Sequence, residues 1–229
     1  MSGYHMGGVV IMITKLFPIA VLVLGLLIIC PASASAQELK TIQLPEPQMS
    51  GGRPLMQVLK ERKSSRTFSA DTLPKQLLAN MLWAAFGINR PESGGRTAPS
   101  AMDRQEIDVY VATADGLYLH DAKLNALKQV LAGDIRATTG LQSYVQEAPV
   151  NLIYVADFSR MGDMKDEDKV FYSAANAGFI GENVYLYCAS ERLAAVVRGA
   201  IDRPALAKAM GLKPNQRVIL AQTVGYPKK

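Results

Sequence analysis

The sequence predicts an α+β fold, and two observations carry that prediction. Segments with strand-like and helix-like patterns follow one another without a regular strand–helix–strand period, whereas parallel α/β folds are built from repeated crossover units. No G-x-G-x-x-G string follows a strand-like segment, which argues against a dinucleotide-binding Rossmann unit. We therefore expect one α+β domain after an N-terminal targeting segment.

Residues 1–36 have the pattern of a secretory signal. One charged side chain, Lys15, precedes an apolar run over 16–30, and the small-residue string 32–36 follows. This order of charge, apolar core and A-x-A ending predicts cleavage after Ala36. The run is short for a bilayer span of about 20 residues, so we expect a periplasmic or secreted protein. The alternative is a chain anchored by an uncleaved N-terminal segment.

Three further features bear on export. Met12 is a second candidate start, because it leaves a more typical signal length. Lipidation at Cys30 is disfavoured, since Ile29 stands where a small residue is wanted. No twin-arginine pair precedes the apolar run, which predicts export of an unfolded chain that acquires any cofactor outside the cytoplasm.

The mature chain, residues 37–229, has the length of one ordinary domain. Removal of Lys15 leaves 24 Lys plus Arg against 20 Asp plus Glu, a net charge of +4. There is neither a basic run nor a pattern of interleaved aromatic residues, so nucleic acid is not an expected partner.

Cys188 and His120 are the cysteine and the histidine of the mature chain. One cysteine forms no internal disulfide, and one cysteine with one distant histidine forms no zinc site. Both Ser-His-Asp and Cys-His-Asn catalysis would need His120, which we expect to be a surface residue just past a strand. A bound organic cofactor is then the natural carrier of any difficult chemistry.

Hydrophobic periodicity predicts the elements in order. The expected helices cover 54–63, 74–86, 123–131, 138–146, 168–191 and 203–210, and the expected strands cover 107–113, 117–119, 150–156 and 217–224. The first two strands are expected to form a hairpin, and 150–156 a buried central strand. Residues 37–52 read as an extended entry arm. Small residues of the longest helix, at 174, 177, 178 and 181, predict close approach of another backbone.

Residues 61–68, ERKSSRTF, combine three cations and two hydroxyls. The cations Arg62, Lys63 and Arg66 are suited to charge-assisted hydrogen bonds with phosphate oxygens, with Ser64 and Ser65 between them. The alternative is a solvated helix end whose cations complement the helix dipole. A second candidate is the polar loop 89–104, whose length favours a binding loop over a simple connector.

Four segments resemble the nitroreductase family. Arg62–Phe68 matches the family string R-[RHK]-S-x-[RK]-x-F at every constrained position. Residues 98–101, Ala-Pro-Ser-Ala, resemble the start of the family's P-S-x-x-N-x-Q loop, where Gln105 falls on the Gln position and Asp103 replaces Asn. The long helix and 193–199 follow, with Arg192 where glycine is common, and the chain ends with the family's closing strand and G-Y-P.

This resemblance implies a nitroreductase-like fold, with a mostly antiparallel central sheet flanked by helices, that forms a homodimer. It implies an FMN cofactor at the subunit interface that exchanges hydride at N5. The residues implied to bind FMN are Arg62, Lys63, Ser64, Arg66, Pro99, Ser100, Ala101, Gln105, Val197, Arg198 and Gly199. Backbone N–H groups of 197–199 are expected at the N5 and O4 edge, and a cation near N1 and O2: Arg198, Arg96 or a terminal lysine.

The function implied is that of an exported FMN-dependent oxidoreductase acting on a small organic substrate, such as a nitroaromatic compound or a quinone. We assign no catalytic residue, because the flavin carries the chemistry. Nicotinamide donors are expected to be scarce outside the cytoplasm, so the electron donor and the reaction direction stay open. The alternatives are a non-catalytic flavin- or ligand-binding protein of the same fold, favoured by the departures at Asp103 and Arg192, and an α+β domain without flavin.

Overall fold

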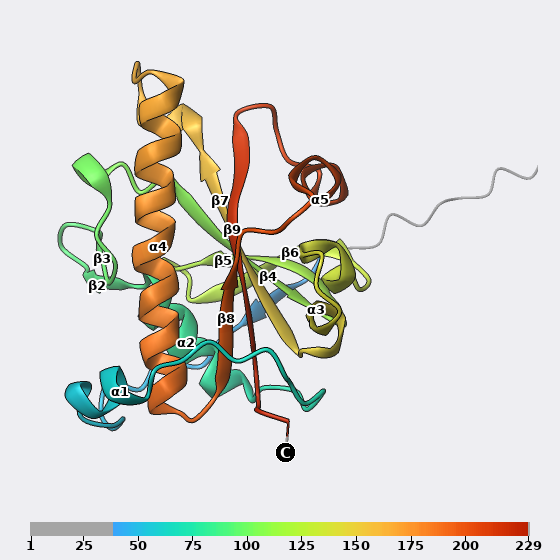
Figure 1. Ribbon diagram of the computed structural model, residues 1–229. Coiled ribbons are helices and arrows are strands. Elements are labelled where there is room, and N and C mark those ends of the chain that lie inside the picture. The colour runs from blue at the N-terminus through green and yellow to red at the C-terminus, as the bar shows by residue number, and fades with distance from the viewer. Residues whose placement is uncertain (1–38, 229) are drawn as a thin grey trace, which may run out of the picture. The chain divides into compact units, whose positions relative to one another are not determined.

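The computed structural model describes residues 39–228, all within one compact unit (Figure 1). The predicted signal, 1–36, lies outside the described residues. The helices are α1 Leu55–Glu61, α2 Lys75–Phe86, α3 Tyr144–Glu147, α4 Asp166–Ser190 and α5 Arg203–Met210, with 3-10 turns η1 Ala101–Asp103, η2 Arg136–Thr139 and η3 Phe158–Met161. The strands are β1 Thr41–Gln43, β2 Ile88–Arg90, β3 Gly95–Arg96, β4 Ile107–Thr113, β5 Gly116–Asp121, β6 Ala126–Ala132, β7 Val150–Asp157, β8 Ala194–Arg198 and β9 Gln216–Gly225.

A seven-stranded sheet is the centre of the described chain. Its order is β1-β6-β5-β4-β7-β9-β8, and every neighbouring pair is antiparallel. The predicted antiparallel sheet and the β4–β5 hairpin are therefore confirmed. β7 lies between β4 and β9 and is buried from Val150 to Ala156, which confirms the predicted central strand. β8 lies at one end of the sheet order, so one of its two edges has no strand partner in this sheet.

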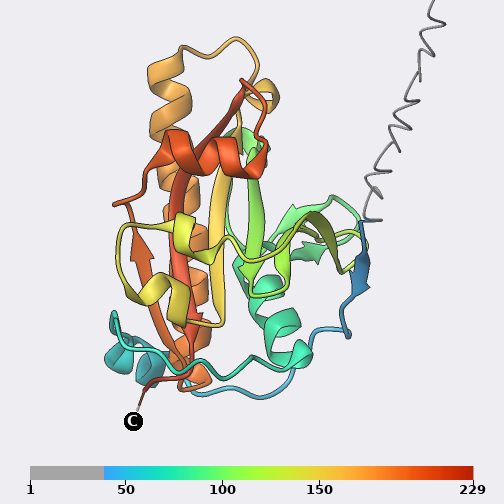
Figure 2. The same cartoon turned by 90° about the vertical axis from the view of Figure 1, so that its right-hand side faces the viewer.

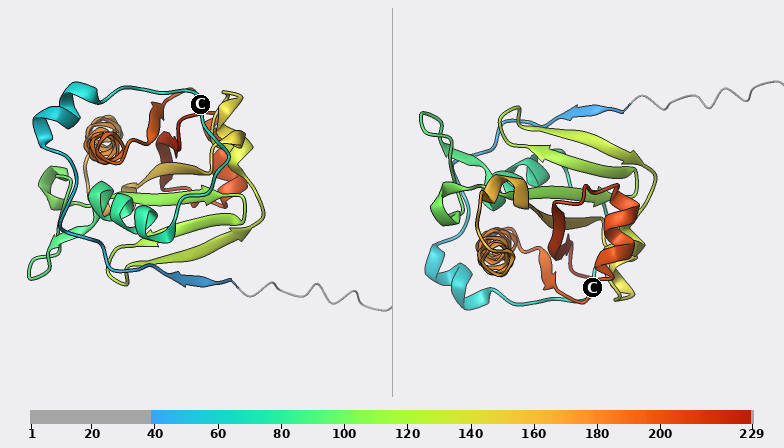
Figure 3. Two further views of the ribbon diagram at one scale, coloured as in Figure 1. Left: turned by 90° about the horizontal axis from the view of Figure 1, so that it is seen from below. Right: turned by 90° about the horizontal axis from the view of Figure 1, so that it is seen from above.

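Helices cover both faces of the sheet, with α2 and α4 on one side and α5 on the other (Figures 2 and 3). Alternate residues of β4 serve the two sides: Val109 and Val111 pack with α2 and α4, whereas Tyr110 and Ala112 pack with α5. Each fully buried Val, Leu, Ile, Phe or Met side chain contributes about 1.5–3 kcal/mol to the free energy of folding. The α5 core is the smaller, and it closes the sheet face opposite the long helix. In the part of the chain that is described, no helix has the length and hydrophobicity to cross a membrane.

The small residues of α4 lie along the boundary of its buried face. Ala177 and Gly181 are buried, and a Cβ on Gly181 would lie 3.1 Å from Val197 Cγ2. Ala174 and Gly178 are exposed. The inner pair therefore lets α4 approach β8 closely, and the outer pair leaves a shallow strip of helix surface open.

Two predicted helices are wrong. Residues 123–131 contain strand β6, because the Asp121 carboxylate accepts the N–H groups of Lys123 and Leu124 and forms a turn that returns the chain beside β5. Residues 138–146 are divided between η2 and α3 by Gly140, whose backbone is extended. In the first segment, pairing with β5 and β1 overrides local helical periodicity. In the second, the extended backbone at Gly140 interrupts the helix.

The end of α4 is a Schellman motif with arginine in the glycine position. The Leu193 N–H donates to the Cys188 carbonyl at 2.7 Å, and the Arg192 N–H donates to the Ala189 carbonyl at 3.4 Å. Arg192 has φ 58°, the left-handed conformation that glycine usually supplies at this position. The backbone turn is therefore the one expected for glycine, although the side chain differs.

Replacing Arg192 by glycine is expected to raise the free energy of unfolding by about 0.5–1 kcal/mol. Glycine adopts positive φ without the roughly 1–2 kcal/mol steric penalty of other residues, although its greater freedom in the unfolded chain offsets part of the gain. Denaturant unfolding followed by circular dichroism measures the change. Gly211 is the matched control, because it has φ 65° after α5 and nothing lies within 4 Å of an added Cβ. Gly211→Ala should lower the free energy by a similar amount, and a loss of stability in Arg192→Gly would contradict the assignment.

Candidate functional site

The chain after α1 lies along the free edge of β8. Arg62 ends the helix with φ −54° and ψ 124°, so the chain leaves in an extended conformation. The Ser65 N–H then donates to the Ala195 carbonyl at 2.9 Å. Phe68 is buried beside Ala194 and Val196 and forms an isolated bridge with Pro227. The predicted anion-binding segment is thus held at both ends.

Tyr185 of α4 connects this segment to β8. Its hydroxyl oxygen lies 2.8 Å from Ser64 Oγ and accepts a hydrogen bond from the Val197 N–H, also at 2.8 Å. The Arg62 guanidinium lies over the Tyr185 ring, 5.2 Å from its centroid, a cation–π geometry. Sequence reasoning missed Tyr185, since nothing in the helical pattern distinguishes it from neighbouring core residues.

A cavity of about 460 Å³ lies beside the segment, and several cations line it. Its walls include Arg53, Glu61, Lys63 and Arg192. Arg53 and Glu61 form an ion pair at 2.5 Å, and the hydrogen bond from Arg53 lowers the pKa of the Glu61 carboxyl. Within residues 39–228, neither Lys63 nor Arg192 forms an ion pair. The cavity therefore carries an excess of positive charge, which suits an anion.

The backbone N–H groups of Val197, Arg198 and Gly199, which we predicted to face the flavin, differ in whether they already have a hydrogen-bond partner. The Val197 N–H is already donated to Tyr185, and Arg198 pairs with Ala221 of β9. Gly199 is exposed, and its N–H has no hydrogen-bond partner among residues 39–228. Gly199 is accordingly the one of the three whose N–H remains open to a ligand at this edge.

The Arg198 side chain is buried, with 4% of its surface exposed. It donates to Thr223 Oγ1 at 2.9 Å, to the Thr139 carbonyl at 2.6 Å and to Asn151 Oδ1 at 2.9 Å. Burial lowers the pKa of the guanidinium to about 10. Its donors face the sheet interior, so the side chain is not available as the expected cation near N1 and O2.

The Pro99–Ala101 loop is fastened to a different part of α4. The Ala101 N–H donates to Asn176 Oδ1 at 3.2 Å, and Asn176 Nδ2 donates to the fully buried Glu106 carboxylate at 2.9 Å. Ser100 Oγ accepts the Gln105 N–H at 2.8 Å. Pro99 is exposed, whereas Ser100 and Ala101 are partly buried.

Gln105 and Asp103 hold the loop in a strained form. Gln105 Oε1 accepts from Arg96 at 2.8 Å, and Gln105 Nε2 donates to Asp103 Oδ1 at 2.9 Å. Met102, Asp103 and Gln105 all have φ between 47° and 51°. Non-glycine residues in this region are uncommon, and they cluster at ligand sites. The carboxylate of Asp103 thus helps to hold the loop, by accepting the hydrogen bond from Gln105.

In a single chain the predicted site forms two separate groups. Arg62, Ser64 and Val197 meet at Tyr185, whereas the Pro99–Ala101 loop meets α4 at Asn176, nine residues earlier. At 1.5 Å per residue the two attachments lie roughly 13 Å apart along the helix. The assignment of these residues to FMN stays a prediction.

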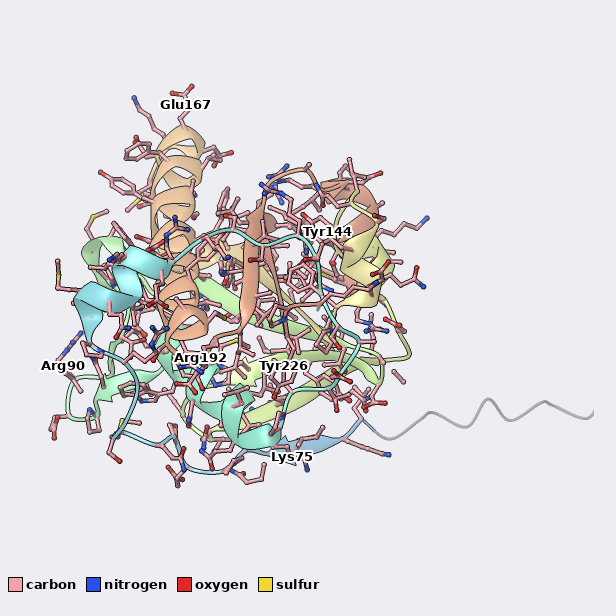
Figure 4. The ribbon with its side chains drawn as sticks, turned by 60° about the horizontal axis from the view of Figure 1, so that its bottom comes forward. Lys75, Arg90, Tyr144, Glu167, Arg192 and Tyr226 are labelled. Atoms are coloured by element: carbon pink, nitrogen blue, oxygen red, sulfur yellow. The ribbon has the colours of Figure 1, made fainter. Side chains whose placement is uncertain are left out.

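A larger cavity, of about 1360 Å³, has Arg192 and Tyr226 among its lining residues, and both are labelled in Figure 4. Its lining is mostly apolar and contains none of the residues predicted to bind FMN. It lies at the Ala194 end of β8, since Tyr226 follows Gly225, the residue opposite Ala194. Since none of the predicted residues lines this cavity, we place the candidate site along the edge of β8 and not in the cavity.

His120 is on β5, not beyond it, and its side chain is partly buried. Burial, reinforced by the nearby Arg96 cation, lowers the pKa of the imidazole to about 4. Arg96 donates to the Phe86 carbonyl at 3.0 Å, and its guanidinium lies 4.9 Å from the Phe86 ring centroid. His120 is therefore neutral and structural near pH 7, and Arg96 is also engaged within its own chain.

His120 is expected to make the protein less stable as the pH falls. Its folded-state pKa is below the ordinary 6.5, so the unfolded chain binds more protons between about pH 6.5 and 4. The free energy of unfolding should fall by about 1–3 kcal/mol across that window, discounted for the partial exposure of the ring. Urea unfolding at several pH values measures it. In His120→Gln this component should be absent, and equal slopes of the free energy of unfolding against pH in both proteins would contradict the assignment.

Comparison with known proteins agrees with this fold. The family model described as the nitroreductase family matches residues 59–226. The chain is 46% identical to a nitroreductase-like protein of Ralstonia eutropha whose crystal structure superposes with a TM-score of 0.79, covering 82% of this chain and 90% of that one. A Methanocaldococcus jannaschii protein provisionally named a nitroreductase is 28% identical over 156 residues, 64% of this chain and 78% of its own.

A nitroreductase-like protein of Desulfovibrio desulfuricans, solved in complex with FMN, has a similar fold. It is 22% identical and superposes with a TM-score of 0.56, covering 78% of this chain and 89% of that one. At this level of identity the similarity shows the fold alone.

Proposed function

Since the chain belongs to the nitroreductase family of oxidoreductases, we propose that it is an exported FMN-dependent oxidoreductase that acts on a small organic substrate. The observation that carries the proposal is the attachment of the cationic segment 62–66 to the free edge of β8, through Ser65 and Tyr185. This attachment brings the cations and hydroxyls of 62–66 to β8, and the open Gly199 N–H follows the same strand, which supports a phosphate site beside a donor for the ring. The N-terminal signal pattern supports export.

The phosphate of FMN would be held by the segment after α1. Ser64 and Arg66 are exposed, and Arg62 is held over the Tyr185 ring. Charge-assisted hydrogen bonds contribute roughly 1.5–3 kcal/mol each, so two or three fix the register of a phosphomonoester. The excess positive charge of the neighbouring cavity, from Lys63 and Arg192, adds long-range attraction for the dianion.

The ring system of FMN would lie along β8 beyond Val197. Here the Gly199 N–H would be the donor for the ring edge. Gly181, which has no side chain, lets α4 pack closely against Val197. The donor set therefore fits a flavin phosphate at one end and a polar ring edge at the other. When bound, FMN would supply hydride transfer at N5, while the protein positions the ring and its substrate.

We propose that the site is completed in a homodimer. The outer face of α4 exposes three large apolar side chains, Val170, Phe171 and Phe179, at 54%, 67% and 49%. Ala174 and Gly178, between them, are also exposed, so a second helix can approach closely. The separation of the Pro99–Ala101 loop from the Arg62 segment within one chain favours a site to which two chains contribute.

FMN binding tests the proposed function directly. The purified mature chain, incubated with FMN and desalted, should keep the visible flavin absorption. Arg62→Ala/Arg66→Ala should lose it, because removal of two charged donors lowers FMN affinity by at least about a hundredfold.

The control is Lys60→Ala/Lys123→Ala, which removes the same charge from exposed residues outside the segment. This variant should retain FMN. A wild-type protein that remains colourless after incubation would refute the FMN proposal.

The dimer has a separate test. Phe171→Asp/Phe179→Asp should convert a dimer to a monomer in light scattering coupled to size exclusion, because it places two charges in the apolar contact. The control is Glu167→Gln, on the exposed first turn of the same helix (Figure 4). A wild-type monomer, or a dimer that survives both aspartates, would refute this interface.

A further inference from the structure

We propose that Tyr185 is a positioning residue of the anion site: its hydroxyl orients Ser64 so that the Ser64 proton is presented to the ligand phosphate. The inference rests on the proposed function, because it concerns the same site. The donor role of Ser64 then depends on Tyr185, a residue 121 positions away in the chain.

The direction of the hydrogen bonds follows from counting protons. The Val197 N–H can only donate, so the Tyr185 oxygen accepts from it at 2.8 Å. Tyr185 is 9% exposed, and no acceptor for its proton other than Ser64 Oγ lies within hydrogen-bond distance among residues 39–228. A buried hydroxyl proton without an acceptor costs about 1–3 kcal/mol. Tyr185 therefore donates to Ser64.

This assignment determines what Ser64 can do. A hydroxyl has one proton and two acceptor lone pairs. Since Ser64 Oγ accepts from Tyr185, its own proton has no acceptor in the described chain, and Ser64 is exposed. The series Val197 N–H to Tyr185 to Ser64 ends in a donor that faces outward, and each hydrogen bond polarises the next.

The Tyr185 ring adds a second constraint on the same site. The Arg62 guanidinium lies 5.2 Å from the ring centroid, so the aromatic face limits the freedom of a side chain that would otherwise extend into solvent. One residue thereby orders both a neutral and a charged donor. Ordering before binding reduces the entropy lost when a ligand binds.

Tyr187 of the same helix provides the comparison. Its hydroxyl donates to the Leu77 carbonyl at 3.3 Å, in the contact between α4 and α2. Among residues 39–228, its hydroxyl forms no hydrogen bond with Ser64 or with β8. Tyr187→Phe therefore removes a comparable hydroxyl without affecting the hydrogen bonds from Val197 to Tyr185 and from Tyr185 to Ser64.

The test measures FMN and riboflavin affinity by fluorescence titration in wild type, Tyr185→Phe, Ser64→Ala and the double variant. Tyr185→Phe keeps the ring and should weaken FMN about tenfold while leaving riboflavin, which lacks the phosphate, within about twofold. Ser64→Ala alone should weaken FMN binding by a similar factor. Added to Tyr185→Phe, it should weaken binding little further, because the two residues act as one unit. Tyr187→Phe should leave both affinities unchanged.

Other outcomes overturn the proposal in distinguishable ways. If Tyr185→Phe weakens FMN and riboflavin equally, or if the Ser64 and Tyr185 effects add, Tyr185 acts only through the packing of β8 and the positioning role is refuted. If wild type binds FMN and Tyr185→Phe binds it equally well, the role is refuted while the proposed function stands. If wild type binds neither flavin, the proposed function fails, and this role fails with it.

Discussion

The candidate site depends on one contact, the attachment of the chain after α1 to the free edge of β8. A strand edge has N–H and C=O groups that need partners, and here the Ser65 N–H and the Tyr185 hydroxyl provide them for Ala195 and Val197. Burial of Phe68 beyond the cations keeps the segment in place. The same contact provides hydrogen-bond partners for a free strand edge and brings cationic side chains to β8, the strand that Gly199 follows.

Behind β8, the buried Arg198 cation, which has no acidic partner among residues 39–228, joins four elements. Arg198 reaches η2 through Thr139, β7 through Asn151 and β9 through Thr223. A buried charge has a desolvation penalty of several kcal/mol, which is tolerable only when every donor is satisfied. Gly140 is required here because a Cβ would overlap Arg198 Nη1. The network fixes the position of the strand from the side opposite the proposed ligand.

On the other side of the sheet, a buried carboxylate has a similar role for the second half of the site. Glu106 accepts from Asn176 of α4 and from Ser100 of the loop. These bonds hold a backbone in which Met102, Asp103 and Gln105 all have positive φ, a conformation maintained only when the surroundings over-determine it. α4 thus positions both groups of the site, the loop through Asn176 and the cationic segment through Tyr185.

The sequence by itself determined the features that depend on local chemistry. The alternation over 107–113 and the helical period over 203–210 predicted β4 and α5 with their observed bounds. The apolar run 150–156 predicted the central strand, and the family strings placed the cationic segment and the loop in order along the chain. These features are readable because side-chain period and turn chemistry act over a few residues.

Only the tertiary structure decided how those segments meet. Residues 126–132 form a strand because β5 and β1 pair with them, a contact that outweighs their helical periodicity. Tyr185 orders Ser64, and the Arg198 side chain turns inward to Thr139, Asn151 and Thr223. These contacts join residues 25 to 121 positions apart. The pattern of a single helix or strand carries no information on which distant groups satisfy its donors, so the arrangement follows only from the folded chain.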